Sequence, residues 1–434
     1  MRHKLGGKVE LHGLTPVAPL HALRRAKPSD LRRPKPTPDG EGRSVSSFAK
    51  ATEDNPLRIH PRSYTRGFLR RRVKEKTVEE PGIGMARINH QKLLRFVTRS
   101  FEKLGAPAND AQIAAKALVT ADLRGVDTHG VIRFNSHSWY VKWLSEGSMK
   151  AKPDIKIIHE TGSSALLDGD RGIGMVIGHR AMELAIRKAK ESGVGLVGVR
   201  NSRHFGMSAN YAMQALPHDM IGIAMTNASR QVVPTFGREA RFGTNPMCFA
   251  VPADREPAFV LDMATTTAAA GKLELAARLG KTVPPGWALD DRAEQTTDPR
   301  TAQKARRLLP LGGSRDGGSH KGYGLAIVVE ILCGVLTGTM TALNADQDPR
   351  GHFFGAIRID SFRPVSEFKQ DMDRLIRELK STPLVPGQER VYVAGEIEFE
   401  TAQERAEQGI PLHSSVLEGL RAVSEQLAVP YELE

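Results

Sequence analysis

The spacing of apolar residues predicts two helices at the start of the regularly patterned part of the chain. From Leu93 to Leu104 apolar side chains recur every three or four positions, behind Asn89 as a suitable N-cap and ahead of Gly105 as a stop. The same spacing continues over residues 109–122. A pair of consecutive helices is therefore expected here.

Beyond residue 155 the pattern changes to short apolar strands that alternate with helices, which is typical of α/β folds. The expected strands cover residues 164–167, 195–199, 221–226, 248–251, 258–262, 355–360 and 390–393. The expected helices cover residues 178–191, a stretch after residue 204, residues 268–279, a segment that begins at residue 320, residues 365–380 and two segments at the end, whereas residues 280–319 are expected to form a loop.

Residues 1–84 differ in composition from the rest of the chain. They hold nine of the 26 prolines, several arginine clusters and no sustained apolar period, which predicts a disordered basic leader. Met85 resembles a natural start, so an incorrectly assigned upstream start is an alternative explanation of the leader.

The formal net charge of +13 at first suggests a nucleic-acid partner. However, residues 1–84 hold 19 of the 62 basic and nine of the 49 acidic residues, so the remainder carries 43 basic and 40 acidic residues. A nearly neutral body gives no reason to expect a phosphate backbone as partner, and nucleic-acid binding stays an alternative only through the leader.

Cysteine content and hydropathy limit the environment of the protein. Cys248 and Cys333 are the two cysteines of the sequence and lie in apolar surroundings, which predicts neither a disulfide framework nor a metal site and favours a reducing compartment, the cytoplasm. The longest apolar run, residues 322–339, is interrupted by Glu330 and is too short for a confident membrane span. We therefore expect no membrane partner.

Residues 127–133, DTHGVIR, bring a hydroxyl, an imidazole and a guanidinium close together, between the expected end of one helix and the start of another. A 2-oxo or 2-hydroxy acid needs a group that moves a proton at its oxygen and a planar fork that holds its carboxylate. His129 and Arg133 have these properties, and Thr128 lies beside the imidazole. A capping or buried structural histidine is the alternative interpretation of His129.

Two downstream tracts add candidates for the same chemistry. His204, in NSRHFG, is a second candidate for the proton carrier, or it closes a turn. Asp262 ends an expected strand, where an acid can bond an imidazole or a ribose, or cap a helix. The hydroxyl groups of residues 265–267 follow directly and can line a cofactor cleft.

Three further tracts have both a functional and a structural interpretation. Lys321 lies at a helix start between glycine-rich segments, where backbone donors favour a pyrophosphate, or it is a surface lysine. Asn245, before Pro246, can present its amide to a substrate or form a turn. The glycine run of residues 172–178 lacks the spacing of a dinucleotide fingerprint, so we expect a turn and a helix start there.

These tracts, in this order, resemble the malate/L-lactate dehydrogenase family of the non-Rossmann type. That family includes ureidoglycolate, sulfolactate and diketogulonate oxidoreductases and a cyclic-imine reductase. The resemblance covers residues 85–427. It rests on ADLRGVDTHGVIR at 121–133, NSRHFG at 201–206, FGTNPMCFAVP at 242–252, LDMATT at 261–266, LPLGG at 309–313, HKGYGLA at 320–326 and GHFFGAI at 351–357.

The resemblance implies an α/β fold with two domains. A non-Rossmann cofactor domain that binds NAD or NADP would cover residues 156–340. The second α/β domain would combine both chain ends, a helical part at 85–155 and an α/β part at 341–434. The family resemblance also implies a homodimer with sites near the subunit interface.

The resemblance also assigns roles to residues. His129 matches the proton donor, Thr128 stands where a serine usually assists it, Arg133 matches the residue that binds the substrate carboxylate, and His204 matches the acid/base of some members, so the proton carrier stays open between the two histidines. Asp262 matches an acidic relay position. The positions that match cofactor contacts are Asp262, Met263, Ala264, Thr265, Thr266, Thr267, His320, Lys321, Gly395 and Glu396.

The chain departs from the family pattern at three places. Thr128 replaces serine, Ala394 stands where proline is usual, and the connection from Thr339 to Gly351 is short. The first change keeps the hydroxyl of the relay and adds a methyl group, and the last can reshape the substrate pocket.

The predicted function is NAD(P)-dependent hydride transfer to or from C2 of a small 2-hydroxy/2-oxo acid, such as malate or lactate, with Asn245 as an additional substrate contact. The alternatives are reduction of a cyclic-imine 2-carboxylate, and a homologue that binds cofactor without turnover.

Overall fold

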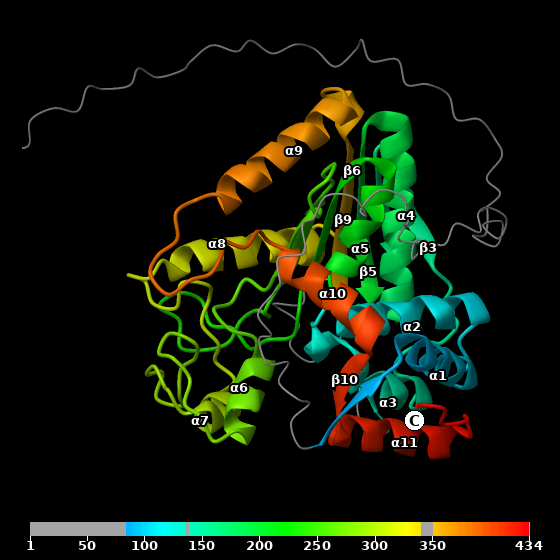
Figure 1. Cartoon of the computed structure of the whole chain (residues 1–434). Coiled ribbons are helices and arrows are strands. Elements are labelled where there is room, and N and C mark those ends of the chain that lie inside the picture. Colours follow the sequence, from blue (N-terminus) through cyan, green and yellow to red (C-terminus); the bar gives the residue numbers. More distant parts are fainter. Residues whose placement is uncertain (1–83, 136–138, 340–349, 434) are drawn as a thin grey trace, which may run out of the picture. The chain divides into compact units, whose positions relative to one another are not determined.

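The structure is a computed structural model that describes residues 84–135, 139–339 and 350–433 (Figure 1). Residues 1–83 of the predicted leader lie outside the described residues, and so do residues 340–349 of the connection that follows Thr339.

A mixed sheet forms the centre of the described fold, with strand order β3-β4-β5-β9-β6-β7-β8. Only the pair β4 and β5 is parallel within this sheet, and the other neighbours are antiparallel. The strands are β3 (Lys156–Glu160), β4 (Ser164–Asp168), β5 (Val194–Ser202), β6 (Met220–Thr226), β7 (Met247–Val251), β8 (Phe259–Met263) and β9 (Arg350–Arg358). Strand β9, far along the chain, lies between β5 and β6.

Helices cover this sheet because their apolar sides pack on its buried residues. Helix α4 (Gly174–Ser192) packs against β5 and β9, and the short α5 (Ala209–Ala212) packs against β6 and β7. Helix α8 (Ser319–Glu330) continues into a π-helical turn, Ile331–Val335, that also contacts β9. The remaining helices that follow the first sheet strands are α6 (Ala270–Arg278), α7 (Pro299–Ala305), α9 (Val365–Lys380) and α10 (Glu396–Gln408).

A second core joins segments from both ends of the described chain. Its helices are α1 (His90–Lys103), α2 (Ala108–Leu123), α3 (Trp139–Ser145) and α11 (Ser414–Leu427), which share one cluster of buried side chains. Beside them β1 (Met85–Ile88) pairs antiparallel with β10 (Ile410–His413) (Figure 1). The predicted α/β class is confirmed. No helix of the described ranges combines the length and apolar composition needed to cross a bilayer.

The largest local error of the sequence analysis is the strand expected at residues 390–393. These residues form no strand, and Arg390 forms an ion pair with Glu400 on α10. Helix α7 was missed inside the expected loop, although Asp298 caps its first backbone N–H groups and Pro299 opens it. The glycine run at 172–178 forms a turn and the start of α4, as predicted.

Candidate active site

The loop that carries His129 is shaped by a buried carboxylate. Two 3₁₀ turns, Asp127–His129 and Val131–Arg133, stand where the sequence predicted the end and start of helices. Asp122 on α2 is 1 % exposed and accepts a hydrogen bond of 2.8 Å from the backbone N–H of Val131. A Cβ atom on Gly130, between the turns, would lie 1.8 Å from Asp122 Oδ1. The close approach therefore requires glycine.

Arg405 of α10 holds the same loop from a second side. Its guanidinium donates to the backbone oxygen of Asp122 and to the carboxylate of Asp127. Burial raises the pKa of the Asp122 carboxyl well above its ordinary value. The loop between α2 and α3 is thus fixed by one side chain beneath it and one from the C-terminal part of the chain.

The structure brings His129, His204 and Arg133 together. The two imidazole rings lie nearly parallel, with their centroids 5.8 Å apart. The Trp139 ring contacts two of these side chains. Its centroid lies 4.5 Å from the Arg133 guanidinium carbon and 4.8 Å from the centroid of the His204 ring. Arg133 Nε donates to the backbone oxygen of Thr128 at 2.8 Å, which orients the rest of the guanidinium.

Each histidine has a hydroxyl at its Nδ1 atom. Thr128 Oγ1 lies 2.9 Å from Nδ1 of His129, and the Tyr140 hydroxyl lies 2.6 Å from Nδ1 of His204. Burial, followed by the charge of Arg133, lowers the pKa of His129 to about 4. Burial, followed by His129 and Arg350, lowers the pKa of His204 well below its ordinary value. Both rings are therefore neutral at pH 7.

Asp262 lies at the end of β8, as predicted, but its carboxylate bonds backbone groups. Oδ2 accepts a 2.6 Å hydrogen bond from the backbone N–H of Ala209, and the N–H of Ser208 is a further donor. The side chain of Asp262 is exposed, and desolvation by the protein around it raises the pKa of its carboxyl to about 6. Among the described side chains, the hydrogen bonds of this carboxylate include none to His129 or His204. The structure thus gives Asp262 the position of a cap on α5.

The hydroxyl groups after Asp262 are used within the protein. Thr265 donates to the backbone oxygens of residues 244 and 245, Thr266 donates to that of residue 268, and Thr267 donates to that of Pro310. These bonds hold the segment that contains Met263 and Ala264 against two neighbouring loops. The predicted cofactor contacts of residues 262–267 stay a prediction.

Asn245 is fully buried, and its amide is used within the protein. Its nitrogen donates to the backbone oxygen of Ala326 and to Glu330, and its oxygen accepts from the N–H of Ala228. Both amide hydrogens are therefore engaged inside the protein, and the predicted substrate contact of Asn245 stays a prediction.

The predicted helix start at Lys321 is present as the N-terminus of α8. His320 and Lys321 are exposed in its first turn, and a glycine-rich loop packs so closely behind them that a Cβ on Gly312 would lie 2.7 Å from the backbone nitrogen of Ser319. Exposed basic groups at a helix N-terminus suit an anionic pyrophosphate. These residues therefore fit the phosphate portion of a nicotinamide cofactor.

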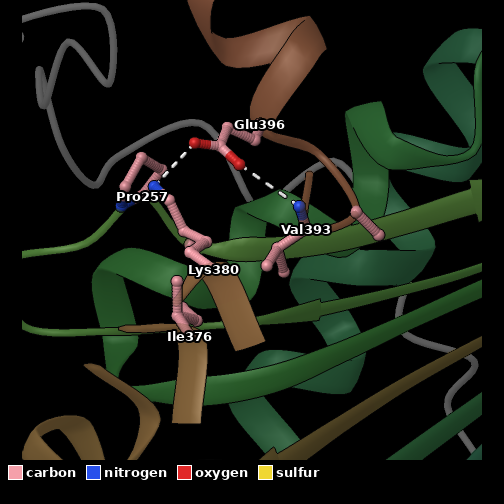
Figure 2. Close-up of a pocket in the computed structure, with 7 residues that line it drawn as sticks. Pro257, Ile376, Lys380, Val393 and Glu396 are labelled. Atoms are coloured by element: carbon pink, nitrogen blue, oxygen red, sulfur yellow. Dashed lines mark hydrogen bonds and ion pairs between the residues drawn. The ribbon is translucent and has the colours of Figure 1, made fainter. Parts of the chain in front are cut away.

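Gly395, with φ +91°, packs on Val260 of β8. Glu396, the next residue, forms an ion pair of 2.7 Å with Lys380 and accepts a hydrogen bond from the N–H of Val393 (Figure 2). The cavity beside them is about 10 Å³ in volume, which is the size of one water. Glu396 is thus engaged within the protein, and its predicted cofactor contact stays a prediction.

Several residues of the site were missed by sequence reasoning. Asp122 lies in the tract ADLRG, directly before the loop of His129. Its contact with Gly130 and Val131 could not be predicted from the sequence. Tyr140 and Trp139 come from α3, whose approach to His204 depends on tertiary packing. In the ranges that the structure describes, no three His, Cys, Asp or Glu side chains are grouped to hold a metal.

Replacing Gly130 with alanine should destabilise the protein, because the added Cβ would collide with the buried Asp122 carboxylate. We expect the free energy of unfolding to fall by about 1–3 kcal/mol, the usual cost of overpacking. Urea unfolding measures this. The control is Gly162→Ala, where a Cβ meets no atom within 4 Å and the change should stay within about 0.5 kcal/mol. Equal effects of both substitutions would contradict the packing argument.

The ring of His129 should titrate with a pKa near 4 in the folded protein. Because the unfolded chain binds this proton near pH 6.5, the neutral ring contributes stability above that pH, and the contribution is lost as the pH falls toward 4. NMR titration of the ring protons, assigned with His129→Asn, measures the pKa. Arg133→Gln should raise it in part, and a wild-type value at or above 6.5 would disprove the burial argument.

Comparison with known proteins identifies the family of the chain. Residues 88–421 match the malate/L-lactate dehydrogenase family. The malate dehydrogenase of Pyrococcus abyssi is 43 % identical over 349 residues, which cover 79 % of this chain and 95 % of that protein. The L-sulfolactate dehydrogenase of Methanocaldococcus jannaschii is 38 % identical over 350 residues, which cover 79 % and 97 %.

Two solved structures have the same fold. The malate dehydrogenase of Entamoeba histolytica superimposes with a TM-score of 0.77 at 35 % identity, over 80 % of this chain and 99 % of that one. The Δ1-piperideine-2-carboxylate reductase of Pseudomonas syringae superimposes with a TM-score of 0.68 at 26 % identity, over 78 % and 99 %. The family prediction is confirmed: the chain belongs to the malate/L-lactate dehydrogenase family of oxidoreductases.

Proposed function

We propose that this chain catalyses reversible oxidation of a small 2-hydroxy acid to the 2-oxo acid, with malate and lactate as the first candidates. The observation that carries the proposal is the grouping of two neutral imidazoles, His129 stacked on His204, with the Arg133 guanidinium, which shares Trp139 with His204. When bound, the nicotinamide cofactor supplies or takes up the hydride at its C4 atom. Membership of the malate/L-lactate dehydrogenase family supports hydride transfer as the reaction of this cluster of side chains.

The residues of the site have different proposed roles. Arg133 binds the substrate carboxylate through its two terminal nitrogens, since its Nε is bonded to the loop. One of the two imidazoles, His129 or His204, moves the proton at the substrate oxygen. Thr128 orients His129 through its Nδ1 atom. Fixing the acid in this way makes the reaction effectively unimolecular.

The cofactor, NAD or NADP, is assigned to the other part of the site. His320 and Lys321 would hold the pyrophosphate at the N-terminus of α8, and residues 262–267 with Gly395 and Glu396 would line the rest. We keep residues 156–340 as the proposed cofactor domain, with residues 85–155 and 341–434 as the proposed second domain. The central sheet joins the two, because β9 of the last segment lies between β5 and β6 of the first. The cytoplasm is the proposed location, supported by two buried free cysteines.

A cyclic imine is the second candidate substrate. It is favoured by the structural similarity to the piperideine-carboxylate reductase, with a TM-score of 0.68. Arg133 would hold its carboxylate in the same way, and the imidazole would protonate the ring nitrogen.

A substrate panel tests the function. We expect nicotinamide absorbance at 340 nm to fall when the protein is mixed with reduced cofactor and a 2-oxo acid. Both NADH and NADPH should be offered, with malate and lactate oxidation as the reverse assays and cyclic-imine carboxylates as the alternative. His129→Asn should slow turnover about a hundredfold and leave cofactor binding intact, because it removes a proton carrier and no binding group. Cofactor binding without turnover on any substrate would contradict the proposal and favour an inactive homologue.

A homodimer is the proposed assembly. Val328, Ile331, Val335 and Leu336 are 43 %, 48 %, 57 % and 62 % exposed along α8 and its π-helical turn. Exposed apolar side chains at this helical spacing are typical of a surface that another protein covers, and we assign them to a contact with a second copy.

Substituting Leu336 with glutamate should dissociate the dimer, because the charge would be buried at the contact. Light scattering after size exclusion measures the mass. Val385→Glu is the control, since Val385 is 67 % exposed in the loop before α10 and should leave the mass unchanged. A wild-type monomer would rule out the assembly.

A further inference from the structure

The surroundings of His204 determine which of its nitrogens carries the hydrogen. Its Nδ1 atom lies 3.3 Å from the backbone nitrogen of Gly206, in addition to the Tyr140 hydroxyl at 2.6 Å. A backbone N–H can only donate, so Nδ1 must be the acceptor. The hydrogen of the neutral ring therefore stays on Nε2. Gly206 adopts φ +79°, a left-handed conformation that favours glycine.

Tyr140 is built into the core as a permanent donor. Its side chain is 0 % exposed, and its ring packs edge-on against Phe101 and Trp143 at 6.4 and 6.0 Å. Burial raises the pKa of its phenol further above the ordinary value, so the hydroxyl keeps its proton. The phenol and the Gly206 amide thus both point donors at Nδ1 of His204.

The hydrogen-bond partner of His129 does not fix its tautomer. The Thr128 hydroxyl at its Nδ1 atom can donate or accept. His129 can therefore carry a proton on either nitrogen or on both. A doubly protonated His204 would instead place its Nδ1–H against the N–H of Gly206, and two donors would face each other.

The charged groups around His204 also favour the neutral form of its ring. After burial, protonation of His204 is disfavoured by the His129 ring whenever that ring is protonated, by the charges of Arg350 and Arg133, and by His352 when it is protonated. Because the rings of His129 and His204 are 5.8 Å apart, a proton held by one ring disfavours a second proton on the other.

We propose that Tyr140 is a positioning residue that, with the Gly206 amide, holds His204 as its neutral Nε2–H tautomer. Resting on the proposed function, His204 then donates a hydrogen bond to the substrate oxygen, and His129 is the ring that gains and loses the proton. In 2-hydroxy acid oxidation the hydroxyl proton passes to Nε2 of His129, the hydrogen on C2 leaves with its electron pair to the oxidised nicotinamide, and the C2–O bond becomes a carbonyl.

The tautomer can be read without turnover. Long-range proton–nitrogen correlation spectra of the full chain with ¹⁵N-labelled histidine distinguish a bonded from an unprotonated ring nitrogen, and His204→Gln assigns the signals. We expect His204 in the wild type as Nε2–H and still neutral at pH 5.5. Tyr140→Phe should add an Nδ1–H population and lower kcat/KM about tenfold, chiefly through KM, because the donor to the substrate is less well oriented.

The control is Tyr431→Phe, a hydroxyl removed from the same core, where Tyr431 packs on Phe96. This variant should change neither the His204 signals nor kcat/KM. Thermal unfolding of both variants separates a general loss of stability from a specific effect on His204. An Nδ1–H signal for His204 in the wild type, or a Tyr140→Phe protein with unchanged signals and KM, would overturn the proposal.

Conservative variants assign the proton. His204→Gln keeps an N–H donor for the substrate and should retain turnover within about tenfold, whereas His129→Gln should lose about a hundredfold or more. The opposite order would transfer the proton to His204. If the expected tautomer is present while the substrate panel is silent, the proposed function fails and the tautomer assignment stands.

Discussion

The site depends on one contact, the buried carboxylate of Asp122 against the backbone at Gly130 and Val131. Burying a carboxyl is costly unless its oxygens receive hydrogen bonds, and the N–H of Val131 supplies one. In return the chain turns sharply between two 3₁₀ turns, so that His129 precedes the bend and Arg133 follows it. The grouping of imidazole and guanidinium follows from that bend.

His204 is held by the packing of neighbouring helices rather than by a buried carboxylate such as Asp122. His204 follows β5, and α4 approaches it so closely that a Cβ on Gly174 would lie 2.5 Å from the backbone oxygen of His204. Helix α3 brings Tyr140 and Trp139 from the other core. His204 is therefore held between the two cores, whereas the loop of His129 follows α2 of the second core. The stacked arrangement of the two imidazole rings depends on how these cores pack on each other.

Sequence patterns predicted what depends on local spacing. Helices α1 and α9 came out within a residue or two, because an N-cap at Asn89 and a regular apolar period mark such helices. The residues that share the site were also identified in DTHGVIR and NSRHFG. The partners of these residues were not, because Tyr140 and Arg405 reach the site through contacts between distant segments, which leave no local signal. The strand expected at residues 390–393 was wrong, because a short apolar pattern does not show whether a neighbouring strand is available to pair with it.

The position of β9 has a consequence for how the chain is made. Strands β5 and β6 are separated by only 17 residues in the sequence, yet they do not pair with each other. Both pair instead with β9, residues 350–358, which is synthesised much later. A ribosome must therefore release most of the polypeptide before the middle of the sheet exists. During that interval two apolar edges stay open, so nascent chains of this protein depend on rapid late insertion, or on chaperones, to avoid pairing with each other.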